Sequence, residues 1–304
     1  MDMSDIAALG ERQRVFRARY KLSEPGLISH ITQRAAGREP LFVEDNDYLT
    51  FIALLKDVAQ KMNLTFYAFC LMPNHAHLLL QPAEKNLSEA MHSIFSRYAM
   101  RFNRKYQRRG HLFGGPFRQA VCLDNTYLLT ASVYIHLNPV RAGLADQATA
   151  YRWSSCSLYC REETQSFVDT EPVLSLIHPQ KDMAKKHYAE LVHQGRDHQP
   201  ENALEQEGAI EAFCSKLAKL FPRLYDKVAR KNRSRAERAE DILELTDLEN
   251  LVQEYQHGEH SGPESREARR YLVEQLLARG FKKTQVADRL GVSRQTVYNI
   301  LNSP

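Results

Sequence analysis

Residues 65–81 read TFYAFCLMPNHAHLLLQ, an aromatic and aliphatic run that is broken at Met72-Pro73-Asn74. Aromatic residues favour strands, and Pro-Asn between two apolar runs favours a turn. The stretch therefore predicts a β-hairpin of two buried strands, Thr65–Leu71 and His75–Gln81. It lies inside the longest uncharged segment, 62–83, whose polar turn residues argue against a membrane span.

The segments on either side of this hairpin predict alternating strands and helices. A strand is expected at Leu27–Arg34, a helix after the acidic run Glu44–Asp47, a long helix beginning at Asn86 or Ser88, a strand at Phe117–Leu123, and a helix capped by Asp124. This last helix should end near Asn138, because Pro139 follows. The order β-α-β-β-α-β-α over residues 27–140 predicts an α+β fold, a ferredoxin-like antiparallel sheet with helices packed on it.

The length of 304 residues predicts more than one domain. We expect the α+β domain at 20–160, a helical extension and linker at 161–204, and an all-α domain at 205–304. Near the C-terminus a short helix is followed by the turn Gly291-Val292-Ser293 and a last helix from Arg294. This spacing predicts a helix-turn-helix at 284–302.

The composition is that of a soluble globular protein, with 43% hydrophobic and 26% charged residues. The net charge of +4 is mild, so an argument for nucleic-acid binding must rest on where the charges lie. Five cysteines without a C-x-x-C pair predict reduced thiols, and Asp2 and Asp5 do not fit a signal peptide. We therefore expect a cytoplasmic protein.

Two histidines stand out on the second strand of the hairpin. Residues i and i+2 of a strand point to the same face, so His75 and His77 can converge on one divalent metal ion. An isolated H-x-H is also compatible with two structural histidines that make local hydrogen bonds, and the pair alone does not decide between the two readings.

A tyrosine and an asparagine on the following helix share a face, since residues i and i+4 are neighbours there. Tyr134 offers a phenolic oxygen, which is a nucleophile once deprotonated. Asn138 offers an amide oxygen, which suits a hard cation. Tyr127, seven residues before Tyr134, lies near the same face and is the alternative nucleophile, but only Tyr134 has an asparagine four residues on.

The whole set of motifs resembles the REP-associated tyrosine transposases, within the single-tyrosine HUH transposases related to IS200. The matching elements are His30-Ile31-Thr32-Gln33-Arg34, Pro73-Asn74-His75-Ala76-His77, Gly110-His111-Leu112-Phe113, Tyr134-Ile135-His136-Leu137-Asn138-Pro139-Val140-Arg141-Ala142-Gly143 and Tyr151-Arg152-Trp153-Ser154-Ser155. They occur in the family's order over roughly residues 20–195. The small Ala76 departs from the hydrophobic residue usual between the histidines.

The resemblance implies an HUH nuclease core that cleaves and rejoins single-stranded DNA at palindromic repeat hairpins. Tyr134 would attack a backbone phosphate and form a 5′-phosphotyrosine, while His75, His77 and Asn138 would hold Mg²⁺ or Mn²⁺. A bacterial, nucleoid-associated protein that is a monomer or a homodimer would fit this activity. The C-terminal part is not common to the family.

A basic stretch between residues 90 and 123 contains no Asp or Glu. Such a run is typical of a solvated helix face, but the absence of acids favours phosphate binding. The candidate DNA-binding residues here are Arg97, Arg101, Arg104, Lys105, Arg108, Arg109 and Arg118.

The last helix presents polar residues where a recognition helix needs them. Arg294, Gln295, Thr296 and Asn299 are expected to face outward and to read bases or phosphates in duplex DNA. A helical hairpin used for protein contacts is the alternative. For the whole protein, the alternatives to a transposase are a non-catalytic DNA-binding regulator that acts through the helix-turn-helix, and an HUH replication or conjugation initiator, for which the chain is short.

Overall fold

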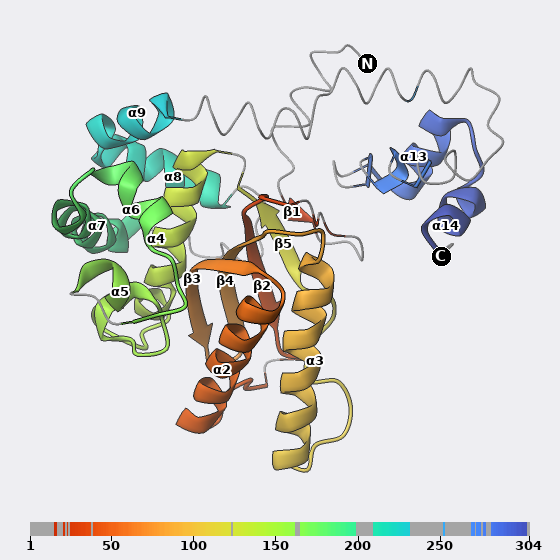
Figure 1. Cartoon of the computed structure of the whole chain (residues 1–304), viewed down its shortest axis with the longest axis horizontal. Coiled ribbons are helices and arrows are strands. Elements are labelled where there is room, and N and C mark those ends of the chain that lie inside the picture. Colours follow the sequence, from red (N-terminus) through yellow and green to blue (C-terminus); the bar gives the residue numbers. More distant parts are fainter. Residues whose placement is uncertain are drawn as a thin grey trace. The chain divides into compact units, whose positions relative to one another are not determined.

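The computed structural model describes residues 15–16, 21, 23, 25–37, 39–122, 124–161, 165–198, 209–231, 252, 269–270, 272–274, 276–277 and 281–302. The chain falls into two compact units (Figure 1). One spans Ser23–Ala236, and the other combines Met1–Leu22 with Glu237–Pro304.

The first unit contains four strands and most of the helices. Its strands are β2 (Ser29–Arg34), β3 (Leu64–Met72), β4 (His75–Pro82) and β5 (Arg118–Val121). Its α-helices are α2 (Asp45–Lys61), α3 (Leu87–Lys105), α4 (Asn125–Arg141), α5 (Cys156–Cys160), α6 (Glu171–Ile177), α7 (Lys181–Gly195), α8 (Ala209–Leu220) and α9 (Pro222–Arg230). Two 3₁₀ turns, η1 (Ala148–Ala150) and η2 (Arg196–His198), complete it, and a two-residue strand, β1 (Val15–Phe16), precedes it in the chain.

The strands of this unit lie in the order β5-β2-β4-β3, and each neighbouring pair is antiparallel. In chain order this is fourth, first, third, second, the arrangement of the split βαβ fold. The α+β fold predicted from the sequence is therefore confirmed. The predicted hairpin is β3–β4, in which Met72 pairs with His75 across the turn.

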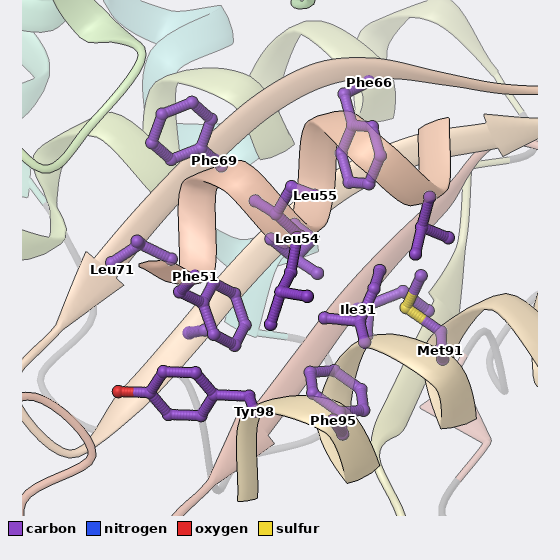
Figure 2. Close-up of a cluster of buried hydrophobic side chains, with 14 of the residues drawn as sticks. Ile31, Phe51, Leu54, Leu55, Phe66, Phe69, Leu71, Met91, Phe95 and Tyr98 are labelled. Atoms are coloured by element: carbon purple, nitrogen blue, oxygen red, sulfur yellow. The ribbon is translucent and has the colours of Figure 1, made fainter. Parts of the chain in front are cut away.

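The two faces of the sheet have different tasks. One face packs on α2 and α3 and carries the hydrophobic core, shown in Figure 2 with Ile31, Phe51, Phe66 and Phe95 among its members. A bulge between Phe66 and Ala68 shifts the register of β3 and keeps both Phe66 and Phe69 in this core. The opposite face carries His30, Thr32 and His77, and it faces α4.

Helix α4 is buried on all sides, because every residue from Tyr127 to Pro139 is buried. Asp124 caps its first turn and accepts a hydrogen bond of 2.6 Å from the Tyr127 N–H. The expected end near Asn138 is wrong, since the helix runs through Pro139 to Arg141. Proline removes the N–H that would bond the Ile135 carbonyl. The side-chain nitrogen Nδ2 of Asn138 lies nearby, 2.9 Å from the backbone carbonyl oxygen of Tyr134 and 3.5 Å from that of Ile135.

The boundary expected near residue 205 also differs from the structure. Helices α8 and α9 belong to the first unit and pack on α4, as Figure 1 shows. Their attachment is specific: the hydroxyls of Tyr225 and Thr130 lie 3.0 Å apart, and Asn125 Nδ2 donates to the Lys231 carbonyl at 3.0 Å. The sequence shows that these helices are amphipathic but not which surface buries their apolar sides. Residues 199–208, in the expected linker, lie outside the described residues.

The second unit contains the helix-turn-helix. Helices α13 (Lys283–Leu290) and α14 (Arg294–Asn302) are joined by a turn in which Gly291 has φ 64°, a left-handed conformation that favours glycine. Ser293 accepts a hydrogen bond of 3.0 Å from the Thr296 N–H and begins the last helix. The buried side of the motif consists of Val286, Ala287, Leu290, Val297 and Leu301.

Candidate active site

His75 and His77 lie on the α4-facing side of β4 with their ring centroids 5.0 Å apart. His77 is fully buried, and His75 is 8% exposed. The register places His77 opposite Thr32 and His75 opposite Arg34 on β2. The convergence predicted from the i, i+2 spacing is therefore present in the structure.

The hydrogen bonds of the two imidazoles leave the same nitrogen without a partner on each ring. His75 Nδ1 lies 2.7 Å from the amide oxygen of Asn74, and His77 Nδ1 lies 2.9 Å from His30 Nε2. Within the described residues, the Nε2 atoms of His75 and His77 are buried and have no hydrogen-bond partner. Buried polar atoms are rarely left in this state, and two such nitrogens side by side fit a bound metal ion.

Burial also keeps both imidazoles neutral. Desolvation and the charges of Arg34 and Arg141 lower the pKa of His75 to about 3 and hold the pKa of His77 well below its usual value. A neutral imidazole is the form that binds a metal. No group of three or more His, Cys, Asp or Glu side chains able to hold a metal occurs in the described parts of the chain.

The ring of Tyr134 lies beside His77 and His30. Its centroid is 6.0 Å from that of His77 and 6.2 Å from that of His30, and its side chain is only 1% exposed. Burial raises the pKa of Tyr134 to about 12, against the opposing effects of the Arg141 and Arg34 charges. The phenol is thus held protonated.

Asn138 lies one turn after Tyr134, as the i, i+4 spacing predicts. Its amide nitrogen donates to the Tyr134 carbonyl at 2.9 Å, and its Oδ1 accepts from Arg141 Nη2 at 3.2 Å. The oxygen predicted as a metal ligand is therefore engaged by a guanidinium in this structure. Its role as a ligand stays a prediction.

Arg34 and Arg141 are site residues that the sequence patterns did not single out. Arg34 ends β2 opposite His75, and Arg141 ends α4 two turns after Tyr134. A signal for Arg141 exists in the same-face spacing Tyr134, Asn138, Arg141. The expectation that the helix ends before Pro139 hides this signal.

A buried polar cluster fixes the other side of the tyrosine helix. His136 Nδ1 lies 2.7 Å from the Tyr188 hydroxyl on α7, and its Nε2 lies 2.8 Å from Ser155 Oγ. Ser155 in turn accepts from the Phe69 N–H of β3 at 2.9 Å. These bonds hold α4 to the sheet and to α7, so the position of Tyr134 is set from both sides of its helix.

Helix α8 covers the outer side of Tyr134. The Phe213 ring centroid is 6.4 Å from that of Tyr134, and Phe213 is fully buried. Gly195, at the end of α7, packs so closely that a Cβ there would lie 3.2 Å from Leu217 and 3.3 Å from Leu137. A side chain at position 195 would therefore push α8 away from α4.

The basic residues of α3 lie on a helix that packs against the opposite face of the sheet from Tyr134. Several of them have acidic partners elsewhere in the chain: Arg97 bonds Asp57 at 2.7 Å, Lys105 bonds Glu44 at 2.7 Å and also Asp47, and Arg108 bonds Glu39. The stretch contains no acids along the sequence, but in space several of its basic side chains are paired with acids from other segments. Phosphate binding by these residues stays a prediction.

Asp47 explains why Lys105 is held in place. Its carboxylate also accepts hydrogen bonds from the Val43 N–H at 2.9 Å and from the Tyr106 hydroxyl at 2.8 Å. Burial alone would raise its pKa, but these bonds and that of Lys105 lower it.

Arg101, Arg104 and Arg109 remain exposed, while Arg118 pairs with Thr32 across β5 and β2 and so lies on the face of the sheet that carries His77.

On the helix-turn-helix, Arg294, Gln295 and Asn299 are exposed and Thr296 is half-buried. Gln295 Nε2 donates to Asn299 Oδ1 at 3.2 Å, which places the two amides together on the outer side of α14. This is the orientation that the sequence predicts for base-reading residues. None of the five cysteines, all of which lie in the described part of the chain, forms a disulfide, and no helix in the described segments is both long and apolar enough to cross a membrane.

Comparison with known proteins agrees with this geometry. Residues 24–138 match the family model for IS200-like transposases, and the match includes His75, His77, Tyr134 and Asn138. Residues 264–303 match the model of a homeodomain-like domain, which contains the helix-turn-helix.

One solved structure resembles part of this chain. It is described as a REP-associated tyrosine transposase bound to a REP hairpin, and it shares 15% sequence identity with this chain. The likeness covers 46% of this chain and 81% of that chain, with a TM-score of 0.38. No curated protein matches the sequence.

The packing of α8 on α4 generates a stability prediction. Phe213→Ala should lower the free energy of unfolding by about 3 kcal/mol, because it empties a buried aromatic site. The matched control is Leu220→Ala on the same helix, where the side chain is 38% exposed and a change of under about 0.5 kcal/mol is expected. The measurement is urea unfolding followed by the fluorescence of Trp153, the single tryptophan, which lies in the first unit. Equal effects of the two variants would contradict the packing.

Proposed function

We propose that this protein is a metal-dependent, single-tyrosine transposase that cleaves and rejoins single-stranded DNA at hairpins of palindromic repeats. The observation that carries the proposal is the Tyr134 ring beside two histidines whose buried Nε2 atoms have no partner in the described part of the chain. A nucleophile next to a metal-binding pair is the arrangement that phosphoryl transfer requires.

The residues of the chain account for the steps of cleavage. The Tyr134 oxygen attacks the phosphorus, a bond forms between them, and the bond from phosphorus to the 3′ oxygen breaks. The phenolic proton is lost and the departing oxygen gains one, so the products are a 5′-phosphotyrosine and a free 3′-hydroxyl. Rejoining is the reverse reaction, and it needs no nucleotide cofactor because the phosphotyrosine keeps the energy of the phosphodiester.

The proposed metal ion is Mg²⁺ or Mn²⁺, held by His75, His77 and Asn138. When bound, it polarises a non-bridging phosphate oxygen and offsets the charge that develops at phosphorus. Asn74 and His30 orient the two imidazoles through their Nδ1 atoms, as partners of metal-binding histidines do. Asn138 is adjacent to Tyr134, so ligand and nucleophile share one rigid helix.

The helix-turn-helix suggests a second DNA contact. We propose that Arg294, Gln295, Thr296 and Asn299 bind duplex DNA near the hairpin, and that this unit directs the transposase to its site. A regulator without catalysis would use the same surface, but it would not need the intact histidine pair and tyrosine. That the protein acts as a monomer or as a homodimer stays a prediction.

Tyr134→Phe should abolish the covalent protein–DNA adduct and leave hairpin binding nearly unchanged, because only the nucleophilic oxygen is removed. Tyr127→Phe is the control, and it should retain the adduct. The measurement is a denaturing gel after incubation with Mg²⁺ and a stem-loop oligonucleotide from the flank of the protein's gene. An adduct in Tyr134→Phe that is absent from Tyr127→Phe would reverse the assignment, and no adduct in any protein would favour the regulator.

Chelation with EDTA should stop cleavage, and Mg²⁺ or Mn²⁺ should restore it. His75→Ala and His77→Ala should each weaken Mn²⁺ binding by about 10-fold or more, since each removes a proposed ligand. Electron paramagnetic resonance of free Mn²⁺ measures this affinity without DNA. His193→Ala, which removes a histidine of α7, should bind Mn²⁺ like the wild type. Cleavage in the presence of EDTA would rule out the metal site.

Replacing Arg294, Gln295 and Asn299 by Ala should weaken duplex binding by about 1–3 kcal/mol for each base-reading side chain that is removed. Cleavage of a bare hairpin should be unaffected, because every proposed catalytic residue lies in the other unit. Lys219→Ala on α8 is the control for the removal of one positive charge. Fluorescence anisotropy with a labelled duplex and a labelled hairpin measures both affinities. Unchanged duplex binding would indicate that the motif makes protein contacts instead.

A further inference from the structure

Two arginines converge on the proposed catalytic atoms from different elements. Arg34 is the last residue of β2 and lies opposite His75, on the same face of the sheet as His77. Arg141 is the last residue of α4, on the helical face of Tyr134 and Asn138. Arg141 Nη2 lies 3.2 Å from Asn138 Oδ1, and the charges of both arginines act to lower the pKa of His75 and of His77 and oppose the rise that burial causes in the pKa of Tyr134.

Arg141 makes a direct contact with one of the proposed functional groups and lies on the helical face of another. Its Nη2 donates to Asn138 Oδ1 at 3.2 Å, and it follows Tyr134 by seven residues, two turns along α4. Tyr134 and Asn138 are buried, whereas Arg141 is half-buried. The guanidinium thus lies at the edge of the site, next to the amide oxygen of Asn138.

The local charge at this point of the fold favours an anion. Carbonyl groups at the C-terminal end of α4 carry partial negative charge, so the helix itself does not attract a phosphate there. The charges that shift the pKa of Tyr134 are those of Arg141 and Arg34, both positive. A planar guanidinium offers two parallel donors to a phosphate, which a lysine does not.

We propose that Arg141, assisted by Arg34, binds the non-bridging oxygens of the scissile phosphate and is a catalytic residue of the cleavage reaction. This inference rests on the proposed function. As the Tyr134 oxygen bonds to phosphorus and the bond to the 3′ oxygen breaks, negative charge grows on the non-bridging oxygens, and the two guanidinium groups stabilise it. The phenolic proton is lost and the 3′ oxygen is protonated, so no other reactant is needed.

The same movement would release Asn138. When the Arg141 guanidinium turns to the phosphate, Asn138 Oδ1 gives up its present donor and becomes available to a cation. Arg141 therefore connects the arrival of the DNA phosphate with the completion of the metal site. Without DNA, the guanidinium satisfies the amide oxygen of Asn138.

The test compares a charged and a neutral phosphate at the cleaved linkage. With the stem-loop oligonucleotide from the gene's flank, Arg141→Ala should slow adduct formation about 10²–10³-fold relative to wild type, the cost typical of removing a charge-stabilising donor. With a methylphosphonate at the mapped cleavage position, one anionic oxygen is absent, and the ratio of the two rates should fall below about 10-fold. Arg141→Lys should lie between, because it keeps the charge and lacks the paired donors.

Control measurements separate this inference from the proposed function. Arg223→Ala, an exposed arginine on α9, should react like the wild type on both substrates. Trp153 fluorescence shows whether Arg141→Ala keeps the fold. Equal slowing on the two substrates, or no slowing at all, would overturn the role of Arg141. Failure of the wild-type protein to form any adduct would instead overturn the proposed function.

Discussion

The burial of α4 on all sides is the constraint on which the rest of the structure depends. The sheet packs on one side of this helix, and α6, α7, α8 and α9 pack on the others. The helix that carries Tyr134 gains a fixed position from such packing, because every rotation would disturb close-packed neighbours. The hydrogen bonds of His136 and Thr130 also fix how α4 is rotated and placed against its neighbours, since these bonds form in one register only.

The division of the sheet into two faces separates stability from chemistry. Ile31, Leu78 and Leu80 alternate with His30, His77 and Leu79 along β2 and β4, so one strand pair supplies both the core and the site. A substitution on the α2–α3 side changes packing, and one on the α4 side changes the polar groups around Tyr134. This separation also weakens the case for α3 as the surface that delivers DNA to the tyrosine.

Much of the fold could be predicted because its signals are local. The alternation in the hairpin, the Asp124 cap and the Gly291 turn each act within a few residues, and each appears where the sequence places it. The partner of an amphipathic helix is not a local property, which is why the sequence places α8 and α9 in the wrong domain. The charges of α3 fail for the same reason, since Asp47 and Asp57 are remote in sequence and adjacent in space.

The site shows the same contrast at the level of single residues. Short spacings, i, i+2 on a strand and i, i+4 on a helix, bring His75, His77, Tyr134 and Asn138 together correctly. Arg141 escapes prediction because a proline usually marks the end of a helix. Here the Asn138 amide faces the carbonyl that Pro139 leaves without an N–H, and the helix continues far enough for Arg141 to reach the site.

Asn138 lies at the point where the helix passes the proline, and its Oδ1 accepts from Arg141 at 3.2 Å. In the proposed reaction this oxygen must be free for a cation, so a cation and Arg141 would compete for it. The proposed role of Asn138 as a ligand therefore depends on where the end of α4 places Arg141.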